Sequence, residues 1–257
     1  MGHLDHAAFG WLTPVLSYAM ACTGSALGLR CTVRGLDATG RSRRNWLIAA
    51  ASAIGTGIWT MHFVAMLGFG VTGTQIRYNV PLTILSLLVA MAVVGAGLFA
   101  VGYGRDRHRA LVFGGLTTGV GVASMHYLGM AALQLHGQVR YDLALVALSV
   151  VIAVVAATAA LWAALSIRSP VAVAAASLVM GGAVSSMHYT GMMAVSVRVA
   201  PSGVPLSGAT AMQFIFPLAV GLGSYLFLTA AFVALSPMSG RTEASPSARR
   251  PVEGAAR

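Results

Sequence analysis

Three short segments of the sequence combine histidine with methionine in the same order. Each reads Thr or Ser, Met, His, Phe or Tyr, a variable residue, Ala or Gly, and a second Met. The histidines are separated by 64 and 62 residues. Imidazole and thioether groups favour copper, especially Cu(I), over hard cations. The predicted metal ligands are Met61, His62, Met66, Met125, His126, Met130, Met187, His188 and Met192.

Long apolar stretches must position these segments. Of the 257 residues, 57% are apolar and 9% are charged, whereas soluble domains have about 45–50% and about 25%. A bilayer core of about 30 Å needs about 20 apolar residues of helix. Seven stretches meet this requirement and predict an all-α, polytopic membrane helix bundle over residues 1–235. They are Trp11–Thr32, Trp46–Leu67, Pro81–Tyr103, Ala110–Leu133, Leu143–Ser166, Pro170–Val195 and Met212–Leu235.

The motif-bearing helices, near residues 46–67, 110–133 and 170–195, repeat once per helix pair. Within a motif, the histidine and the methionine four residues later share one helix face. If the three helices pack about one axis, three imidazoles and up to six thioethers converge in one site. Neutral ligands suit a water-poor site better than carboxylates, because a buried charge is costly there. The alternative interpretation is that each methionine fills space and each histidine binds a neighbouring helix.

The distribution of arginine predicts the orientation of the bundle. All 16 basic residues are Arg, and thirteen of them follow the first, third, fifth or seventh helix. Only three lie in the opposite connections, which places the N-terminus outside and the C-terminus in the cytoplasm. The first apolar run lacks a cationic segment before it and is interpreted as a retained span. Residues 236–257, rich in Ser, Pro, Ala and Arg, predict a disordered cytoplasmic tail.

Several residues outside the motifs also have predicted roles. Asn79 and Asp142 are expected to start the third and fifth helices. His3, His6 and His136 lie on the predicted outer side, where they either deliver or cap a metal or are ordinary solvated residues. Small residues that let membrane helices approach closely are predicted at Gly114/Gly115, Gly119/Gly121 and Gly181/Gly182.

The repeated segments resemble the signature of the MHYT-domain family of bacterial integral membrane sensor proteins. Only Met187-His188-Tyr189-Thr190 spells the motif in full, since the first copy has Phe63 and Val64 and the second has Leu128. The resemblance covers residues 9–235 and implies a sensor whose Met and His hold copper near the outer face. It also implies oxygen, carbon monoxide or nitric oxide as the signal. In many relatives the domain is fused to cyclic-dinucleotide enzymes.

These patterns predict a sensor or signalling protein in the cell membrane, with the lipid bilayer as a partner. An enzyme is not expected, because the sequence has no Ser-His-Asp set, paired carboxylates or phosphate loop in a suitable context. Clustered cations beside aromatics, typical of nucleic-acid binding, are also missing. All six acidic residues lie outside the spans, which argues against a proton-coupled transporter. A Met- and His-lined copper carrier stays open as the alternative, and signalling output is expected from a separate cytoplasmic protein.

Overall fold

A computed structural model of the chain describes residues 4–5, 10–200 and 204–235. In this part of the chain, seven helices are long and apolar enough to cross a membrane, so the predicted multi-pass bundle is confirmed. They are α1 (Leu12–Asp37), α2 (Gly40–Leu67), α3 (Val80–Tyr103), α4 (Arg107–Ala131), α5 (Leu143–Ser166), α6 (Pro170–Met193) and α7 (Phe216–Leu235), the last preceded by a π-helical turn, η1 (Ala211–Ile215). His3, His6 and the predicted tail lie outside the described residues.

Polar residues directly before α3, α4, α5 and α6 explain where these helices begin. The side chains of Asn79 and Asp142 accept hydrogen bonds from backbone N–H groups in the first turns of α3 and α5. Both predicted helix starts are therefore confirmed. Asp106 and Ser169 cap α4 and α6 in the same way. Such caps stabilise a helix because its first N–H groups have no partner within the helix.

The first two helices are longer than their apolar runs. The predicted first span ends at Thr32, but α1 continues to Asp37, and α2 begins at Gly40 rather than Trp46. The arginines that interrupt the hydropathy pattern still belong to the helices, because their charged ends reach past the apolar core. The guanidinium of Arg34, for example, lies 5.2 Å from the centre of the Trp46 ring. A hydropathy criterion ends the predicted span at such residues, although the helix continues through them.

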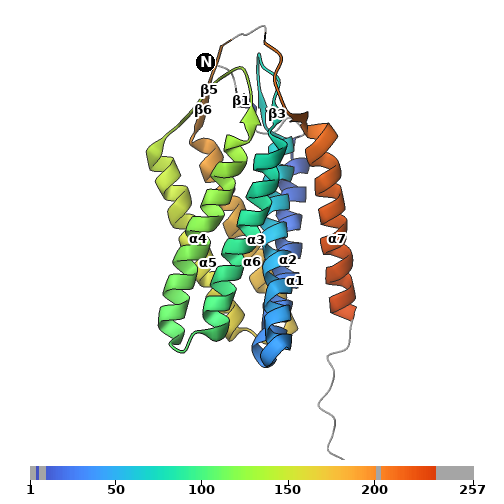
Figure 1. Cartoon of the computed structure of the whole chain (residues 1–257), viewed down its shortest axis with the longest axis vertical. Coiled ribbons are helices and arrows are strands. Elements are labelled where there is room, and N and C mark those ends of the chain that lie inside the picture. Colours follow the sequence, from blue (N-terminus) through green and yellow to red (C-terminus); the bar gives the residue numbers. More distant parts are fainter. Residues whose placement is uncertain (1–3, 6–9, 201–203, 236–257) are drawn as a thin grey trace, which may run out of the picture.

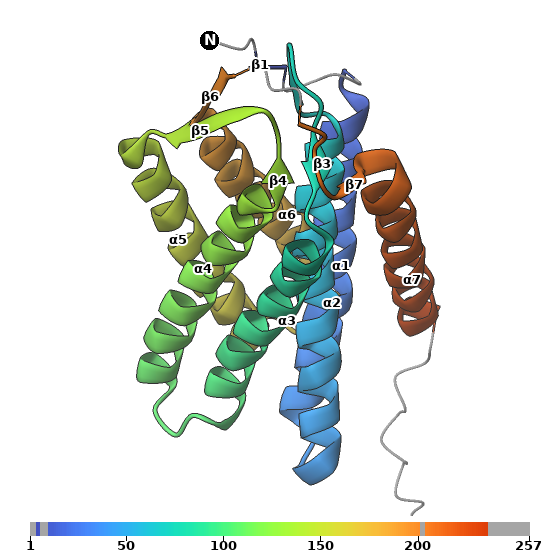
Figure 2. The same ribbon diagram turned by 45° about the horizontal axis from the view of Figure 1, so that its top comes forward.

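The first six helices form a closed ring in chain order, with α6 packed against α1. The seventh helix, α7, packs outside this ring against α1 and α2 (Figures 1 and 2). Large apolar side chains such as Phe113, Trp162 and Val179 are more than half exposed on the outer surface. An apolar exterior of this kind suits a protein surrounded by lipid.

Short antiparallel ribbons close the helix pairs at one end of the bundle, called here the strand end (Figure 1). Strand β1 pairs with β2, β3 with β4 and β5 with β6, so each pair joins the residues before and after one helix hairpin. Strand β7 adds to β3. The strands are β1 (Leu4–Asp5), β2 (Gly70–Val71), β3 (Arg77–Tyr78), β4 (Leu133–Gln134), β5 (Gly137–Tyr141), β6 (Val195–Val199) and β7 (Ala209–Thr210).

The structural repeat is therefore a helix hairpin closed by a ribbon, with the motif on its second helix. The three hairpins are α1–α2, α3–α4 and α5–α6, and α7 has no counterpart in the ring. The loop end, opposite the strand end, holds the tight connections at 38–39, 104–106 and 167–169. The start of α1 and the end of α7 lie at opposite ends of the bundle, as an odd number of spans requires (Figure 1).

Small residues allow the ring helices to touch. A Cβ added at Gly24 of α1 would lie 2.6 Å from the Gly57 Cα of α2, which no real contact tolerates. A Cβ at Gly114 would lie 3.2 Å from the Leu161 side chain, a tight contact. The prediction is wrong at Gly182, because nothing lies within 4 Å of a Cβ there. Clashes under 3.0 Å with a neighbouring helix confirm the prediction at Gly115, Gly119, Gly121 and Gly181.

Candidate metal centre

The three motif histidines meet inside the ring. His62 on α2, His126 on α4 and His188 on α6 are at most 1% exposed. Each lies five residues before the last residue of its helix, about 8 Å along the axis from the strand end. Their Nδ1 atoms are 3.0 Å apart for His62–His188, 3.1 Å for His62–His126 and 3.3 Å for His126–His188. The motif spacing thus places three imidazoles in one cluster, the histidine triad.

Protons alone cannot satisfy this arrangement. A neutral imidazole carries one N–H, and each ring nitrogen offers in the ring plane either that hydrogen or a lone pair. Three Nδ1 atoms in a triangle can therefore make at most two hydrogen bonds at once. The remaining pair faces either two lone pairs or two hydrogens. A cation shared by three lone pairs would remove this conflict between the Nδ1 atoms.

The opposite ring nitrogens point into spaces that only small residues leave open. The Nε2 atoms of His62 and His126 are buried and have no hydrogen-bond partner among the described residues. A Cβ at Gly129 would lie 2.6 Å from His62 Nε2, and one at Gly191 would lie 2.5 Å from His126 Nε2. The glycine three residues after His126 and the glycine three residues after His188 thus each make room for an imidazole from another motif. The sequence displayed these small residues, but their role depends on contacts between helices.

The aromatic residue after each histidine braces the imidazole. Phe63, Tyr127 and Tyr189 pack edge-on against the preceding histidine, with ring centres 4.6, 4.8 and 5.0 Å apart. Two of these rings continue the contact to the strand end, where Phe63 meets Tyr78 and Tyr127 meets Tyr141. Burial raises the pKa of Tyr78, so its phenol stays protonated. Edge-to-face packing restricts the rotation of the imidazoles and excludes water.

Two hydrogen bonds tie the motifs to the following helix. The hydroxyl of Tyr127 lies 2.7 Å from the Ser149 hydroxyl of α5. Phe63, at the same motif position, has no hydroxyl, and the indole N–H of Trp59 donates instead to Ser86 Oγ of α3, at 2.9 Å. The equal spacing of the two serines was visible in the sequence. That Trp59 replaces the tyrosine as the partner of the serine was not visible, because Trp59 lies one helical turn earlier in its motif than Tyr127 does.

All six predicted methionine ligands are buried. None is more than 3% exposed, and they are Met61, Met66, Met125, Met130, Met187 and Met192. Helical geometry places the second methionine of each motif one turn from its histidine, toward the strand end. Coordination of a metal by these thioethers stays a prediction.

The remaining histidine with a predicted metal role is separate from the triad. His136 lies in the connection between β4 and β5, and its Nε2–H donates to the Val204 carbonyl at 2.8 Å. Within the described residues, the triad is the one group of three or more His, Cys, Asp or Glu side chains close enough to share a metal ion.

The dimensions of the triad suit a transition metal. Metal–imidazole bonds of about 2.0–2.1 Å place three nitrogen ligands about 3.4 Å apart in a tetrahedral site. The observed separations of 3.0–3.3 Å are smaller by a few tenths of an ångström. Small outward movements of the rings therefore accommodate an ion. Three neutral nitrogen ligands suit zinc, copper, iron or nickel and do not suit calcium or magnesium.

Two segments of the chain match a known protein family. Residues 55–114 and 119–177 match the family described as MHYT, bacterial signalling protein N terminal repeat. Each matched segment runs from a motif-bearing helix through the first helix of the next hairpin and ends in the second helix of that hairpin. No solved structure matches the chain.

Curated relatives are longer signalling proteins. The chain is 39% identical over 193 residues to the bifunctional diguanylate cyclase/cyclic di-GMP phosphodiesterase MucR of Pseudomonas aeruginosa, a match covering 73% of this chain and 28% of MucR. It is 36% identical over 197 residues to the cyclic di-GMP phosphodiesterase NbdA of the same organism, covering 74% and 25%. The signaling protein YkoW of Bacillus subtilis is 31% identical over 215 residues, covering 77% and 26%. The chain thus corresponds to about a quarter of the length of these relatives.

Proposed function

The chain belongs to the MHYT family of bacterial signalling proteins, and we propose that it is the sensing domain of a signalling system in the bacterial cell membrane. Its sensory cofactor is a copper ion held by the histidine triad near the outer face. The observation that carries this proposal is the triangle of three buried Nδ1 atoms, 3.0–3.3 Å apart. A histidine that served only in packing would not need two others directed at the same point.

The chemistry of the site favours copper over zinc. Imidazole binds both metals, but thioether ligands select Cu(I), and all six motif methionines are buried in the bundle. Every one of these ligands is neutral, so the site keeps the full charge of its ion. A buried charge costs more as it grows, which favours a monovalent ion over Zn²⁺ in a region without carboxylates.

The signal in this proposal is a diatomic gas. When bound, Cu(I) with an incomplete set of ligands supplies a position that oxygen, carbon monoxide or nitric oxide can occupy. The protein residues exclude water, since the triad is at most 1% exposed. The aromatic residues after the histidines pack against the imidazoles, so a displacement of an imidazole would move these rings and the helices α2, α4 and α6 that carry them.

The output of the sensor is made by another component. Of the relatives, MucR is a bifunctional diguanylate cyclase/cyclic di-GMP phosphodiesterase and NbdA is a cyclic di-GMP phosphodiesterase. We therefore propose that the described helices have no catalytic activity and act on a cytoplasmic output protein of this kind. The positive-inside rule assigns the loop end to the cytoplasm, where α7 leaves the bundle (Figure 1).

Metal content of the purified full chain tests the proposal. The wild type and a His136→Ala control, whose histidine lies outside the triad, should retain about one copper ion per chain after zinc competition. The His62→Ala/His126→Ala/His188→Ala variant should retain none, while circular dichroism shows that its helices persist. Equal copper in the triple variant and the control would discard the site. Saturable copper uptake into vesicles, lost in His126→Ala, would instead favour the copper carrier.

A further inference from the structure

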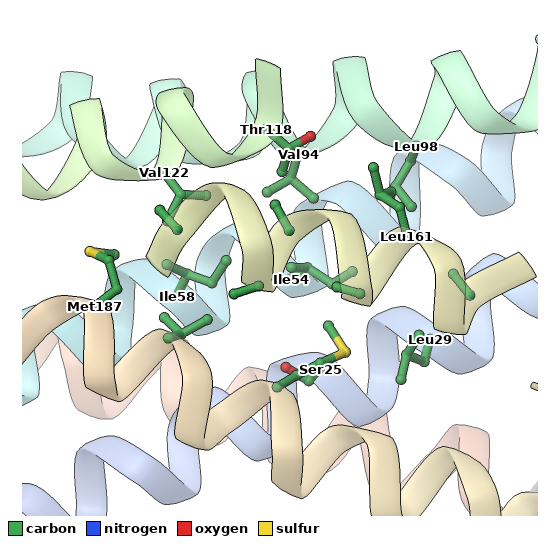
Figure 3. Close-up of a pocket in the computed structure, with 17 residues that line it drawn as sticks. Ser25, Leu29, Ile54, Ile58, Val94, Leu98, Thr118, Val122, Leu161 and Met187 are labelled. Atoms are coloured by element: carbon green, nitrogen blue, oxygen red, sulfur yellow. The ribbon is translucent and has the colours of Figure 1, made fainter. Parts of the chain in front are cut away.

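The six ring helices surround an apolar cavity of about 60 Å³ (Figure 3). The positions of its lining residues before the motif histidines place it on the loop-end side of the triad. All six ring helices contribute to its lining, and α7 does not. Ile58, Val122 and Val184 lie in this lining, each four residues before a motif histidine. One helical turn is about 5.4 Å, so the cavity begins about one turn from the triad.

The repeat that builds the triad also builds the cavity. Positions eight residues before the histidines, occupied by Ile54, Thr118 and Met180, line the cavity as well. Residues spaced by four and eight lie on one helix face. The face that directs each histidine toward the axis therefore continues along the cavity. Met187, which precedes His188, also lines the cavity and connects it to the motif (Figure 3).

Small side chains on α5 leave this volume unfilled. Five lining positions on α5 are alanine, including Ala153 and Ala157, whereas α3 presents Val94 and Leu98. A void inside a protein destabilises the fold, because its walls lose packing contacts. Larger residues on α5 would fill the space, whereas the alanines leave it open to a small occupant.

The lining excludes water and ions. The polar side chains in it are the hydroxyls of Ser25 and Thr118, and Thr118 already donates to the Val93 carbonyl at 3.3 Å. A buried water needs two to four polar partners, and apolar cavities stay dry while binding xenon or similar molecules. An occupant of this cavity must therefore be small, uncharged and apolar.

We propose that the cavity holds one apolar molecule of diatomic size, of the class of oxygen, carbon monoxide or nitric oxide, beside the triad. Such molecules dissolve in the bilayer around the ring, so the membrane supplies the ligand at the depth of the cavity. The signalling meaning of this inference rests on the proposed function. The binding of an apolar molecule is independent of the proposed function, because the lining of the cavity requires no metal.

Crystals of the metal-free full chain under xenon pressure provide the test. Wild-type protein should show a xenon site bounded by Ile58, Val122 and Val184. Ala157→Leu, whose side chain enters the cavity, should lose that site. Ala159→Leu adds the same atoms to an exposed position of α5 and should keep it. Ala157→Val provides a smaller filling variant, expected to reduce occupancy, if the leucine variant does not fold.

The outcomes separate this inference from the proposed function. Ordered water in the cavity, or equal xenon occupancy in Ala157→Leu and Ala159→Leu, would overturn the gas cavity. Loss of xenon in the filled variant alone would support it even if the triad bound no copper. Conversely, if xenon did not bind in the cavity of the wild type, the inference would be refuted even if the triad bound copper.

Discussion

Replacement of Gly191 by alanine tests whether the triad depends on the small residue of the motif. A Cβ at this position would lie 2.5 Å from His126 Nε2, whereas ordinary van der Waals contact begins near 3.4 Å. The imidazole must therefore retreat by about 0.9 Å. Its Nδ1, on the other side of the ring, already lies 3.1 and 3.3 Å from the Nδ1 atoms of the other two histidines. A movement away from the added Cβ would therefore press His126 Nδ1 against the other two imidazoles.

This displacement is large for a metal site. Metal–ligand distances are defined to about 0.2 Å, and disturbing the groups that orient a ligand costs about 10–100-fold in metal affinity. We expect Gly191→Ala to weaken copper binding by that factor, or about 1.4–2.7 kcal/mol. The fold should persist, because alanine is a better helix former than glycine by about 1 kcal/mol.

Gly182→Ala is the matched control, since it makes the same substitution on the same helix. Nothing lies within 4 Å of a Cβ at Gly182, so we expect unchanged copper affinity and equal or higher thermal stability. Competition titration against a Cu(I) chelator measures the affinity of both variants. Wild-type affinity in Gly191→Ala would refute the role of Gly191 as the space for His126.

Three further predictions follow from other contacts. Trp59→Phe removes the hydrogen bond to Ser86 and leaves that buried hydroxyl without its indole donor. The free energy of unfolding should therefore fall by about 1–2 kcal/mol in thermal unfolding, and an unchanged midpoint would mean that the bond adds no stability. Asp142→Ala removes the cap of α5 and should lower the free energy of unfolding by about 1 kcal/mol. Asp142→Asn can still cap the helix and should unfold near the wild-type temperature, so equal losses in the two variants would contradict the capping role. Copper affinity should fall at acidic pH, because protons compete with the metal for the lone pairs of the imidazoles; an affinity that stays constant down to the pH at which the helices unfold would indicate thioethers as the main ligands.

The features that the sequence alone determined are those that depend on residues close together in the chain. Hydropathy predicted the seven spans, and polar caps predicted the starts of α3 and α5, because both depend on neighbouring residues. The common depth of the histidines follows from the same principle, since each motif occupies the same place relative to its own helix end. The ribbons were missed. Five of the seven described strands have two residues, too few for an alternation that a sequence pattern can reveal.

Contacts between distant segments were decided by the tertiary structure. The repeat of the motif did not indicate that α7 packs outside the ring while α1 completes it, because either helix is apolar enough for both places. The sequence likewise displayed Gly191 and Ala157 as small residues of similar helices. In the structure, Gly191 leaves space for an imidazole, whereas Ala157 lines a cavity. The difference arises from the neighbouring helices, whose residues are distant in the sequence.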